Sequence, residues 1–354
     1  MGGSRASDGS AGTVPIFAPA KMGLSPLSQG PLRRVVLHAD DFGMNRAATD
    51  GILQGFEHGL LTSTSVLANA PDAERALQEW KRLEADRGRG DLPSSAKRSR
   101  LGDPDLAFDL GVHLNLTQGR PLTGDRYPAE LLDAQGRMPG IFRLFRRLWR
   151  GGRRFALAVE DELSRQIQLL LDHGHRPSHL NGHQYVELIP PVARLVPALL
   201  EKFRIPAVRV AVEPTWARSL AWPAVCPTRW LPAAAQQFYA RRFRKRMDQI
   251  AVSHPDALFG TMTAGCVDLP KLRAFLSAGR RFPLAEIVLH PAQAPAEPPG
   301  NDCDGWHDPL ADMRPKELQM VMSEGLVEQL AKQQLRLARM FPLPEGEGAN
   351  KYES

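Results

Sequence analysis

The sequence predicts an α/β protein in which parallel strands alternate with helical crossovers. Segments with strand character and segments with helical periodicity alternate about seven times along the chain. Residues able to carry chemistry recur where the predicted strands end, which is the arrangement of barrel enzymes. An open doubly wound sheet also fits the alternation, but such a sheet more often gathers its site at one switch point. We therefore expect a (β/α) barrel of about seven strands.

The individual elements follow from local patterns. Short runs that alternate apolar and polar residues, or that are rich in β-branched residues, predict strands, and apolar residues spaced three and four apart predict helices. The predicted strands cover 33–39, 61–69, 106–116, 177–180, 207–212, 258–262 and 285–289. The predicted helices cover 45–58, 71–83, 141–149, 157–171, 192–203, 231–250, 269–276 and 316–339.

Composition divides the chain into one domain and three irregular segments. We expect residues 32–340 to form a single domain that ends with the helix at 316–339. Residues 1–31 are rich in Gly, Ser, Ala and Pro, which predicts a disordered extension. Residues 84–104 contain few apolar residues and predict a flexible insertion, and residues 341–354 predict a loose tail.

Several protein classes are disfavoured by the sequence. No run approaches the ~18 consecutive apolar residues of a membrane-spanning helix. The first thirty residues lack the layout of a secretory signal, and three cysteines leave an odd count without metal-like spacing. Phosphate-binding glycine loops, dinucleotide fingerprints and nucleophile elbows are also missing from the sequence. We expect a cytoplasmic protein.

The net charge of +6 is concentrated in two segments. Residues 143–154 contain six arginines and no acid, and residues 241–246 contain four arginines and a lysine, so the remainder carries −5. Such local basicity is suited to an anionic surface. A nucleic-acid-binding protein is one alternative, but no recognition motif accompanies the arginines and the pattern of Asp and His residues would then have no role. We expect no nucleic-acid partner.

A lipid surface is the other anionic partner considered. Helical spacing places Ile141, Phe142, Phe145, Leu148 and Trp149 along one side of a helix whose arginines border or oppose that side. This pattern is typical of a helix lying in the headgroup layer, and it equally fits a helix whose apolar stripe packs on the barrel. Segments 141–154 and 238–246 are therefore candidates for a peripheral contact with the anionic inner membrane.

Acidic and imidazole side chains mark the ends of four predicted strands. Asp40 and Asp41 end the first strand, His113 lies late in the third, His183 follows the fourth, and His290 follows the last. One carboxylate and two imidazoles from different strands match a site for a divalent cation that keeps open positions for water and substrate. The spacing alone leaves open which of these residues are ligands.

Four motifs carry a resemblance to a known family. His38-Ala-Asp-Asp-Phe-Gly, Gly111-Val-His-Leu-Asn-Leu, His179-Leu-Asn-Gly-His-Gln and Leu289-His-Pro resemble, in order, the motifs of the YdjC-like carbohydrate deacetylases. The resemblance covers about residues 33–293. The stretches Leu-Asn-Gly-His-Gln-Tyr-Val-Glu and Thr-Gln-Gly-Arg-Pro-Leu-Thr-Gly are most similar to the hopanoid-biosynthesis branch of that family.

The resemblance implies a distorted (β/α) barrel and removal of an acetyl group from an N-acetylated sugar. It implies that Asp41, His113 and His183 bind one divalent cation (Mg²⁺ or Zn²⁺), that Asp40 is the base, and that His290 helps to protonate the leaving amine. Further candidate substrate-binding residues are His179, Asn181, Glu187 and Arg209. Many relatives have Asp at the position of Asn181, whose amide can hydrogen-bond but supplies no charge.

The expected substrate is a sugar carried on a membrane lipid, namely an N-acetylglucosaminyl hopanoid. The alternatives are soluble chitooligosaccharides, or the substrate of another single-metal hydrolase. A phosphodiesterase would usually need two metals and more carboxylates than the strand ends supply.

Overall fold

The computed structural model describes residues 33–101, 108–214, 216, 230–294 and 305–340. The expected extension at 1–31 and the expected tail at 341–354 lie outside the described residues. The fold below is that of the unit that begins at Leu32.

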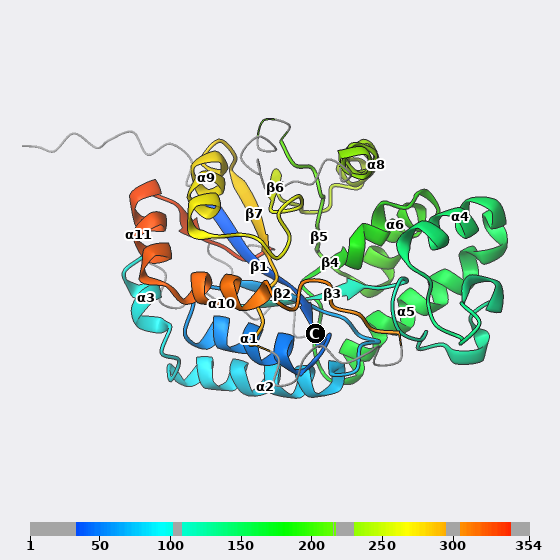
Figure 1. Cartoon of the computed structure of the whole chain (residues 1–354), viewed down its shortest axis with the longest axis horizontal. Helices are drawn as coiled ribbons and strands as arrows, with labels where there is room; N and C mark the ends of the chain where they lie inside the picture. The colour runs from blue at the N-terminus through cyan, green and yellow to red at the C-terminus, as the bar shows by residue number, and fades with distance from the viewer. Residues whose placement is uncertain (1–32, 102–107, 215, 217–229, 295–304, 341–354) are drawn as a thin grey trace, which may run out of the picture. The chain divides into compact units, whose positions relative to one another are not determined.

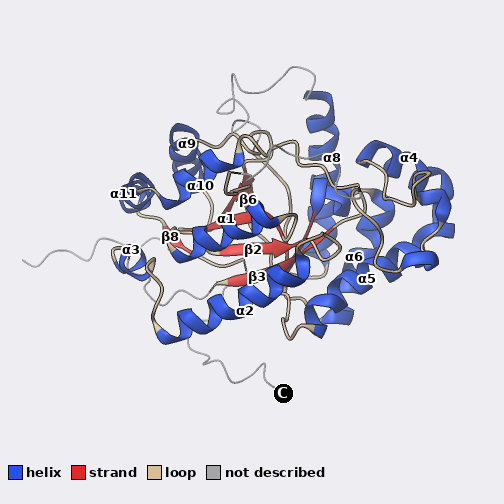
Figure 2. Cartoon of the chain, turned by 60° about the horizontal axis from the view of Figure 1, so that its bottom comes forward, coloured by secondary structure: helices blue, strands red, loops and turns tan. Residues whose placement is uncertain are grey.

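Seven parallel strands form one curled sheet in the order β5-β4-β3-β2-β1-β7-β6 (Figures 1 and 2). An additional short strand, β8, pairs with the first residues of β1. The strands are β1 (Arg34–Phe42), β2 (Ser63–Val66), β3 (Asp109–Leu114), β4 (His179–Gly182), β5 (Ala207–Val208), β6 (Ala257–Phe259), β7 (Leu284–Leu289) and β8 (Arg336–Leu337). The central position of β1 places the carboxylates at its end in the middle of the sheet.

The two edges of the sheet meet beside β5. The amide of Val208 donates to the carbonyl of Ser253 at 3.0 Å, and the amide of Leu258 donates to the carbonyl of Val212 at 3.1 Å. Ala207 and Ser253 form an isolated parallel bridge. These few hydrogen bonds take the place of a full ladder between β5 and β6, so the barrel is distorted. The predicted seven-strand (β/α) barrel is confirmed.

Helices surround the curled sheet. In both overall views α4, α5 and α6 gather at one end, whereas α9, α10 and α11 gather at the other (Figures 1 and 2). No helix among the described residues is both long enough and apolar enough to cross a membrane. The helices are α1 (Arg46–Glu57), α2 (Ala73–Arg89), α3 (Ser95–Ser99), α4 (Ile141–Gly151), α5 (Ala156–Asp172), α6 (Pro190–Phe203), α8 (Trp230–Gln249), α9 (Leu269–Gly279), α10 (Arg314–Met322) and α11 (Glu324–Gln333). Short 3₁₀ segments occupy η1 (Gly124–Arg126), η2 (Ala129–Leu131), η3 (Gly152–Phe155) and η4 (His183–Leu188).

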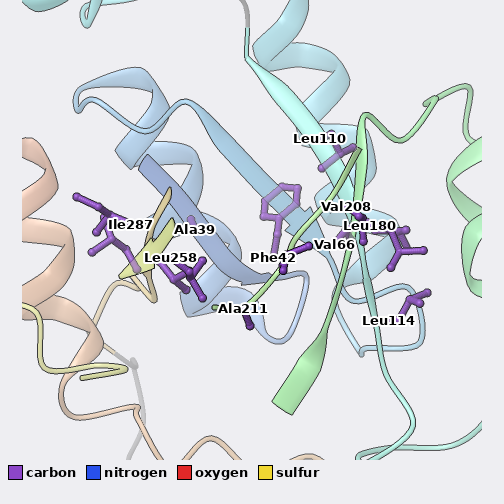
Figure 3. Close-up of a cluster of buried hydrophobic side chains, with 14 of the residues drawn as sticks. Ala39, Phe42, Val66, Leu110, Leu114, Leu180, Val208, Ala211, Leu258 and Ile287 are labelled. Atoms are coloured by element: carbon purple, nitrogen blue, oxygen red, sulfur yellow. The ribbon is translucent and has the colours of Figure 1, made fainter. Parts of the chain in front are cut away.

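The core is formed by strand residues packed against the surrounding helices. Nearly all residues of β1, β2, β3, β4, β6 and β7 are buried, and their apolar side chains, such as Ala39, Val66 and Leu180, contribute to the core (Figure 3). Under α2, Trp80 meets the rings of Phe42 and Phe56 edge-on at centroid distances of 6.0 and 5.0 Å. This packing holds α1 and α2 against β1 and fixes the loop between β1 and α1.

The structure corrects two predicted segments. Helix α2 continues to Arg89, where Gly90 in the left-handed conformation (φ 78°) ends it, and α3 follows within the predicted flexible insertion. This segment is tied to the core because the buried Arg98 donates to the carbonyl of Leu61 at 2.7 Å. The remainder of that segment, 102–104, lies outside the described residues.

The single helix predicted at 316–339 is wrong. The chain leaves the helical conformation at Ser323, whose backbone is extended (ψ 146°) and whose hydroxyl accepts from the amide of Leu326 at 3.3 Å. A serine in this position satisfies a free amide at the start of α11, which stabilises a new helix start over continuation of α10. The last residues form β8 instead of a helical turn.

Candidate metal centre and active site

Two adjacent carboxylates point to the same place at the end of β1. Successive strand residues normally face opposite sides of a sheet, but Asp41 has a positive φ of 69° and the register with β2 shifts between Ala39 and Phe42. As a result Asp40 Oδ2 and Asp41 Oδ1 lie 4.0 and 3.5 Å from Nε2 of His113. A left-handed non-glycine residue costs about 1–3 kcal/mol and marks a functional constraint in many proteins.

Asp41, His113 and His183 form the candidate metal centre. His113 comes from β3, and His183 follows β4 at the start of η4. One ligand atom from each residue lies within 4.8 Å of the other two, and all three residues are buried. His183 Nδ1 lies 2.9 Å from Asp41 Oδ1. Two imidazoles and one carboxylate converging in this way fit a single divalent cation with open coordination positions, and the set does not discriminate between Mg²⁺ and Zn²⁺.

Arg314 holds the outer oxygen of Asp41. Its Nη2 donates to Asp41 Oδ2 at 2.7 Å, and its Nε contacts Asp308 Oδ2 at 2.8 Å. Burial opposes ionisation of Asp41, but Arg314 and His183 outweigh it and hold the pKa of this carboxyl well below its usual range. Asp41 is therefore an ionised carboxylate with Oδ1 turned to the histidines.

Asp40 has a different set of partners. Nη1 and Nη2 of Arg209 donate to its two oxygens, each at 2.8 Å, and His38 Nε2 lies 3.1 Å from Oδ1. Arg209 also donates from Nε to Glu286 at 2.8 Å. Burial raises the pKa of Asp40, but Arg209 overcomes this effect and the pKa lies well below its usual range. Burial raises the pKa of Glu286 to about 7 although Arg209 opposes the rise.

Asn181 connects the two groups of charges. One of its amide atoms lies 2.7 Å from Nδ1 of His113, and the other lies 3.0 and 3.1 Å from the guanidinium nitrogens of Arg209. With the oxygen on Arg209, the amide nitrogen donates to His113 Nδ1, which places the ring proton on Nε2. A His113 that binds a cation through Nε2 needs the opposite: Nδ1–H donating to an oxygen. When His113 binds a cation, both His113 Nδ1–H and Arg209 need an acceptor, and the single amide oxygen can serve only one of them.

His290 faces the centre from the end of β7. Its Nε2 lies 4.0 Å from Asp40 Oδ2, and its backbone amide donates to Glu317 Oε2 at 2.5 Å. Burial lowers the pKa of His290 to about 4, although Asp41 and Asp40 oppose the shift. Nδ1 of His290 has no hydrogen-bond partner among the described residues.

The structure places all four candidate substrate-binding residues in the interior of the domain. The side chains of His179, Asn181, Glu187 and Arg209 are fully buried. The ring of His179 packs against the backbone of Gly111, where a Cβ atom would lie 2.3 Å from Nε2 of the ring. Both oxygens of Glu187 lack a hydrogen-bond partner among the described residues, and burial raises its pKa to about 8. Asn181 and Arg209 contact residues of the centre, and none of the four faces solvent in this structure.

The sequence reasoning missed several residues that the structure brings to the site. These residues share burial and a direct contact with Asp40, Asp41, Arg209 or His290, and they are His38, Glu286, Arg314 and Glu317. Glu286 gave a usable signal, since a charged residue inside an apolar strand requires a buried partner. Arg314 gave none because it lies far along the chain from every motif.

Comparison with known proteins places these motifs in a family. A family model described as YdjC-like protein matches residues 34–332. A carbohydrate deacetylase from Danio rerio is 27% identical over 302 residues, covering 77% of this chain and 86% of the relative. A carbohydrate deacetylase from Vibrio cholerae serotype O1 is 25% identical over 304 residues (86% and 94%), and one from Homo sapiens is 26% identical over 331 residues (88% and 92%).

One solved structure supports the fold. A protein from Enterococcus faecalis, described as a cellobiose-phosphate cleavage protein, superimposes with a TM-score of 0.62. It is 18% identical, and the match covers 87% of this chain and 98% of that protein. Because the family model spans the barrel and every motif at its strand ends, the chain belongs to the YdjC-like protein family.

Proposed function

We propose that this protein is a metal-dependent N-deacetylase that hydrolyses the acetamide of an N-acetylated sugar. The convergence of Asp41, His113 and His183 on one point, with Asp40 and His290 on its border, carries the proposal. The carbohydrate deacetylases among the relatives support the substrate class. Amide hydrolysis needs an activated water, a polarised carbonyl and a protonated leaving amine.

In the proposed mechanism, Asp41, His113 and His183 hold the cation. A divalent cation bound there supplies Lewis acidity, which lowers the pKa of water and polarises the acetyl carbonyl. Arg314 keeps Asp41 ionised and orients its Oδ1 toward the histidines, so the carboxylate is ready to bind without rearrangement.

Asp40 and His290 divide the proton transfers. Asp40 is ionised because of Arg209, so it is in the state that accepts a proton from water. His290 lies across from it and is neutral near pH 7, since burial lowers its pKa to about 4. The proton that Asp40 takes from water is the one that His290 would receive, and an imidazole with so low a pKa would pass it on readily to the leaving nitrogen. Asp40 Oδ2 and His290 Nε2 are 4.0 Å apart, so a proton would pass between them through a bridging group or after a small movement of the side chains.

The test is mass spectrometry of N-acetylated chitobiose after incubation with the protein and a divalent cation. We expect loss of an acetyl group, no loss with chelator-treated protein, and no loss with Asp41→Ala. Acetyl release that persists in both controls would refute the metal-dependent mechanism.

We also propose that the sugar is carried on a membrane lipid, an N-acetylglucosaminyl hopanoid, and that the protein works at the cytoplasmic face of the inner membrane. In the structure Leu144 and Leu148 pack α4 onto the domain, with Phe145 partly buried. Phe142 and Trp149 remain 77% and 64% exposed beside exposed arginines. Exposed aromatic residues bordered by arginines are typical of a helix in the lipid interface.

Vesicle co-sedimentation separates this substrate from a soluble chitooligosaccharide. We expect Phe142→Glu/Trp149→Glu to lose binding to anionic vesicles. The matched control Ser277→Glu/Ala331→Glu adds the same charge at exposed positions of α9 and α11 and should bind like the parent. If the parent protein does not sediment at low salt, or if both variants behave alike, a soluble oligosaccharide is the better substrate.

A further inference from the structure

The two basic segments of the sequence meet in the folded protein. The ring of Phe145 on α4 lies 6.1 Å from the ring of Tyr239 on α8, and it stacks on Trp149 at 5.9 Å. Tyr239 in turn meets Phe238 edge-on at 5.4 Å. We call these four residues the aromatic ridge. Phe238 and Trp149 at its ends are 54% and 64% exposed.

A cavity of about 420 Å³ lies beside this ridge, between α6 and α8. Its volume is within the range of about 300–1,000 Å³ that is usual for small-molecule sites. Tyr239 of the ridge is part of its wall. The lining includes Leu188 of η4, Arg194 of α6, and Arg242, Lys245 and Arg246 of α8. This space is called the cationic cavity below.

The charge of the cationic cavity is of one sign. Four of its ten lining residues are Lys or Arg and none is acidic. The guanidinium of Arg242 lies 4.8 Å from the centre of the Phe238 ring. The nearest acid along α8, Asp248, contacts His254 at 2.9 Å. Several cations around one cavity without a carboxylate are matched to a phosphate group, which arginine binds through paired N–H donors.

We infer that the cationic cavity binds the phosphate of an anionic lipid headgroup while the aromatic ridge enters the interfacial layer. The ridge decides between a lipid and a dissolved phosphate compound, because a soluble ligand of the cavity would leave Phe238 and Trp149 in water. This inference deepens the proposed membrane contact and rests on it. It names the headgroup chemistry and adds Arg194, which lies on α6 outside both basic segments.

The cavity is linked to the catalytic centre by one short segment. η4 begins at His183, a proposed metal ligand, and ends at Leu188, which lines the cavity. Gln184 and Tyr185 within it have positive φ angles of 53° and 60°, so the segment turns tightly between the two sites. The lining of the cavity and the proposed metal centre are therefore joined by only six residues of chain.

The experiment measures binding of the chelator-treated protein to vesicles of phosphatidylcholine with one-fifth phosphatidylglycerol. The test variant is Arg194→Gln/Arg246→Gln. The control is Arg273→Gln/Arg280→Gln, which removes the same charge from two exposed positions, one on α9 and one directly after its end. Thermal unfolding confirms that each variant is folded. Because no sugar or metal is present, the outcome is independent of whether the protein is a deacetylase.

We expect the test variant to bind about 30-fold more weakly than the parent, which corresponds to about 2 kcal/mol for two basic residues near the surface. The control should change binding less than threefold. If the test and control variants lose the same amount of vesicle affinity, the effect comes from net charge alone and the inference is overturned. The variant Phe238→Ser, which removes one end of the aromatic ridge, should also bind vesicles more weakly. If this variant binds like the parent, and millimolar inorganic phosphate displaces the parent from vesicles, the cavity is a site for a soluble phosphate compound and the inference is overturned.

Discussion

Asn181 offers a sharp test of how the centre is built, through the substitution Asn181→Asp. A cation on Nε2 of His113 requires an acceptor at Nδ1, and Arg209 requires an acceptor on its other side. The amide has only one oxygen for these two demands, because one of its terminal atoms lies 2.7 Å from His113 Nδ1 and the other lies 3.0 Å from Arg209 Nη1. A carboxylate at this position can accept from both.

The magnitude follows from the hydrogen bond that the amide must give up. When Asn181 turns its oxygen to His113, its NH₂ group faces the guanidinium, and a charge-assisted hydrogen bond worth about 1.5–3 kcal/mol is lost. We therefore expect Asn181→Asp to tighten Zn²⁺ binding at least about 10-fold. The metal-free protein should become less stable, because a further carboxylate joins Asp40 and Glu286 around Arg209 alone.

Isothermal titration with Zn²⁺, together with thermal unfolding of the chelator-treated protein, measures both effects. The matched control is Asn181→Leu, which keeps the volume but provides no acceptor, and it should weaken Zn²⁺ binding about 10- to 100-fold. An Asp variant that binds Zn²⁺ no more tightly than the parent would refute the reasoning. A Leu variant with unchanged affinity would do so independently.

Three further predictions concern the centre. Replacing Asp41, His113 or His183 by Ala should abolish stoichiometric metal binding, measured by elemental analysis, while unfolding stays cooperative. A variant that retains the metal would show that the replaced residue is not a ligand. Asp40→Asn should keep the metal but lower the rate of acetyl release about 10²- to 10⁴-fold, and a near-normal rate would move the base elsewhere. Burial raises the pKa of Glu187 from 4.5 to about 8 in the folded protein. Between these pH values the folded state holds a proton that the unfolded chain releases, so the free energy of unfolding falls as pH rises from 4.5 to 8. Glu187→Gln should therefore stabilise the metal-free protein by an amount of the order of 3 kcal/mol at pH 7 and by almost nothing at pH 4, and equal effects at both pH values in chemical denaturation would contradict this assignment.

The positions of the strand-end residues could be predicted from the sequence, and their partners mostly could not. Parallel strands bring their carboxyl ends to one edge, so Asp41, His113 and His183 were expected to meet, and the structure brings them together. The partner of Asp41 could not be predicted, because Arg314 is 273 residues away along the chain and lies outside every repeating pattern. Local periodicity carries no information on such long-range pairs.

Helix breaks were hard to predict for a related reason. The apolar spacing through 316–339 is continuous enough to suggest one helix, and only the capping hydroxyl of Ser323 reveals the break. The spacing of apolar residues in α4 also does not show which of them are buried. Leu144 and Leu148 are buried, whereas Phe142 and Trp149 face outward, because the helix is rotated toward the core by packing that the sequence alone does not display.

The partners of the two aspartates support the different roles that we propose for them. Arg209 occupies both oxygens of Asp40, whereas Arg314 occupies only Oδ2 of Asp41 and leaves Oδ1 facing His113 and His183. A carboxylate with one free, oriented and ionised oxygen beside two imidazoles is the better cation ligand. A carboxylate held on both oxygens by a guanidinium is fixed in place and charged, which suits a proton acceptor that must not compete for the cation. We therefore propose separate functions for these two adjacent positions, since each aspartate has its own arginine.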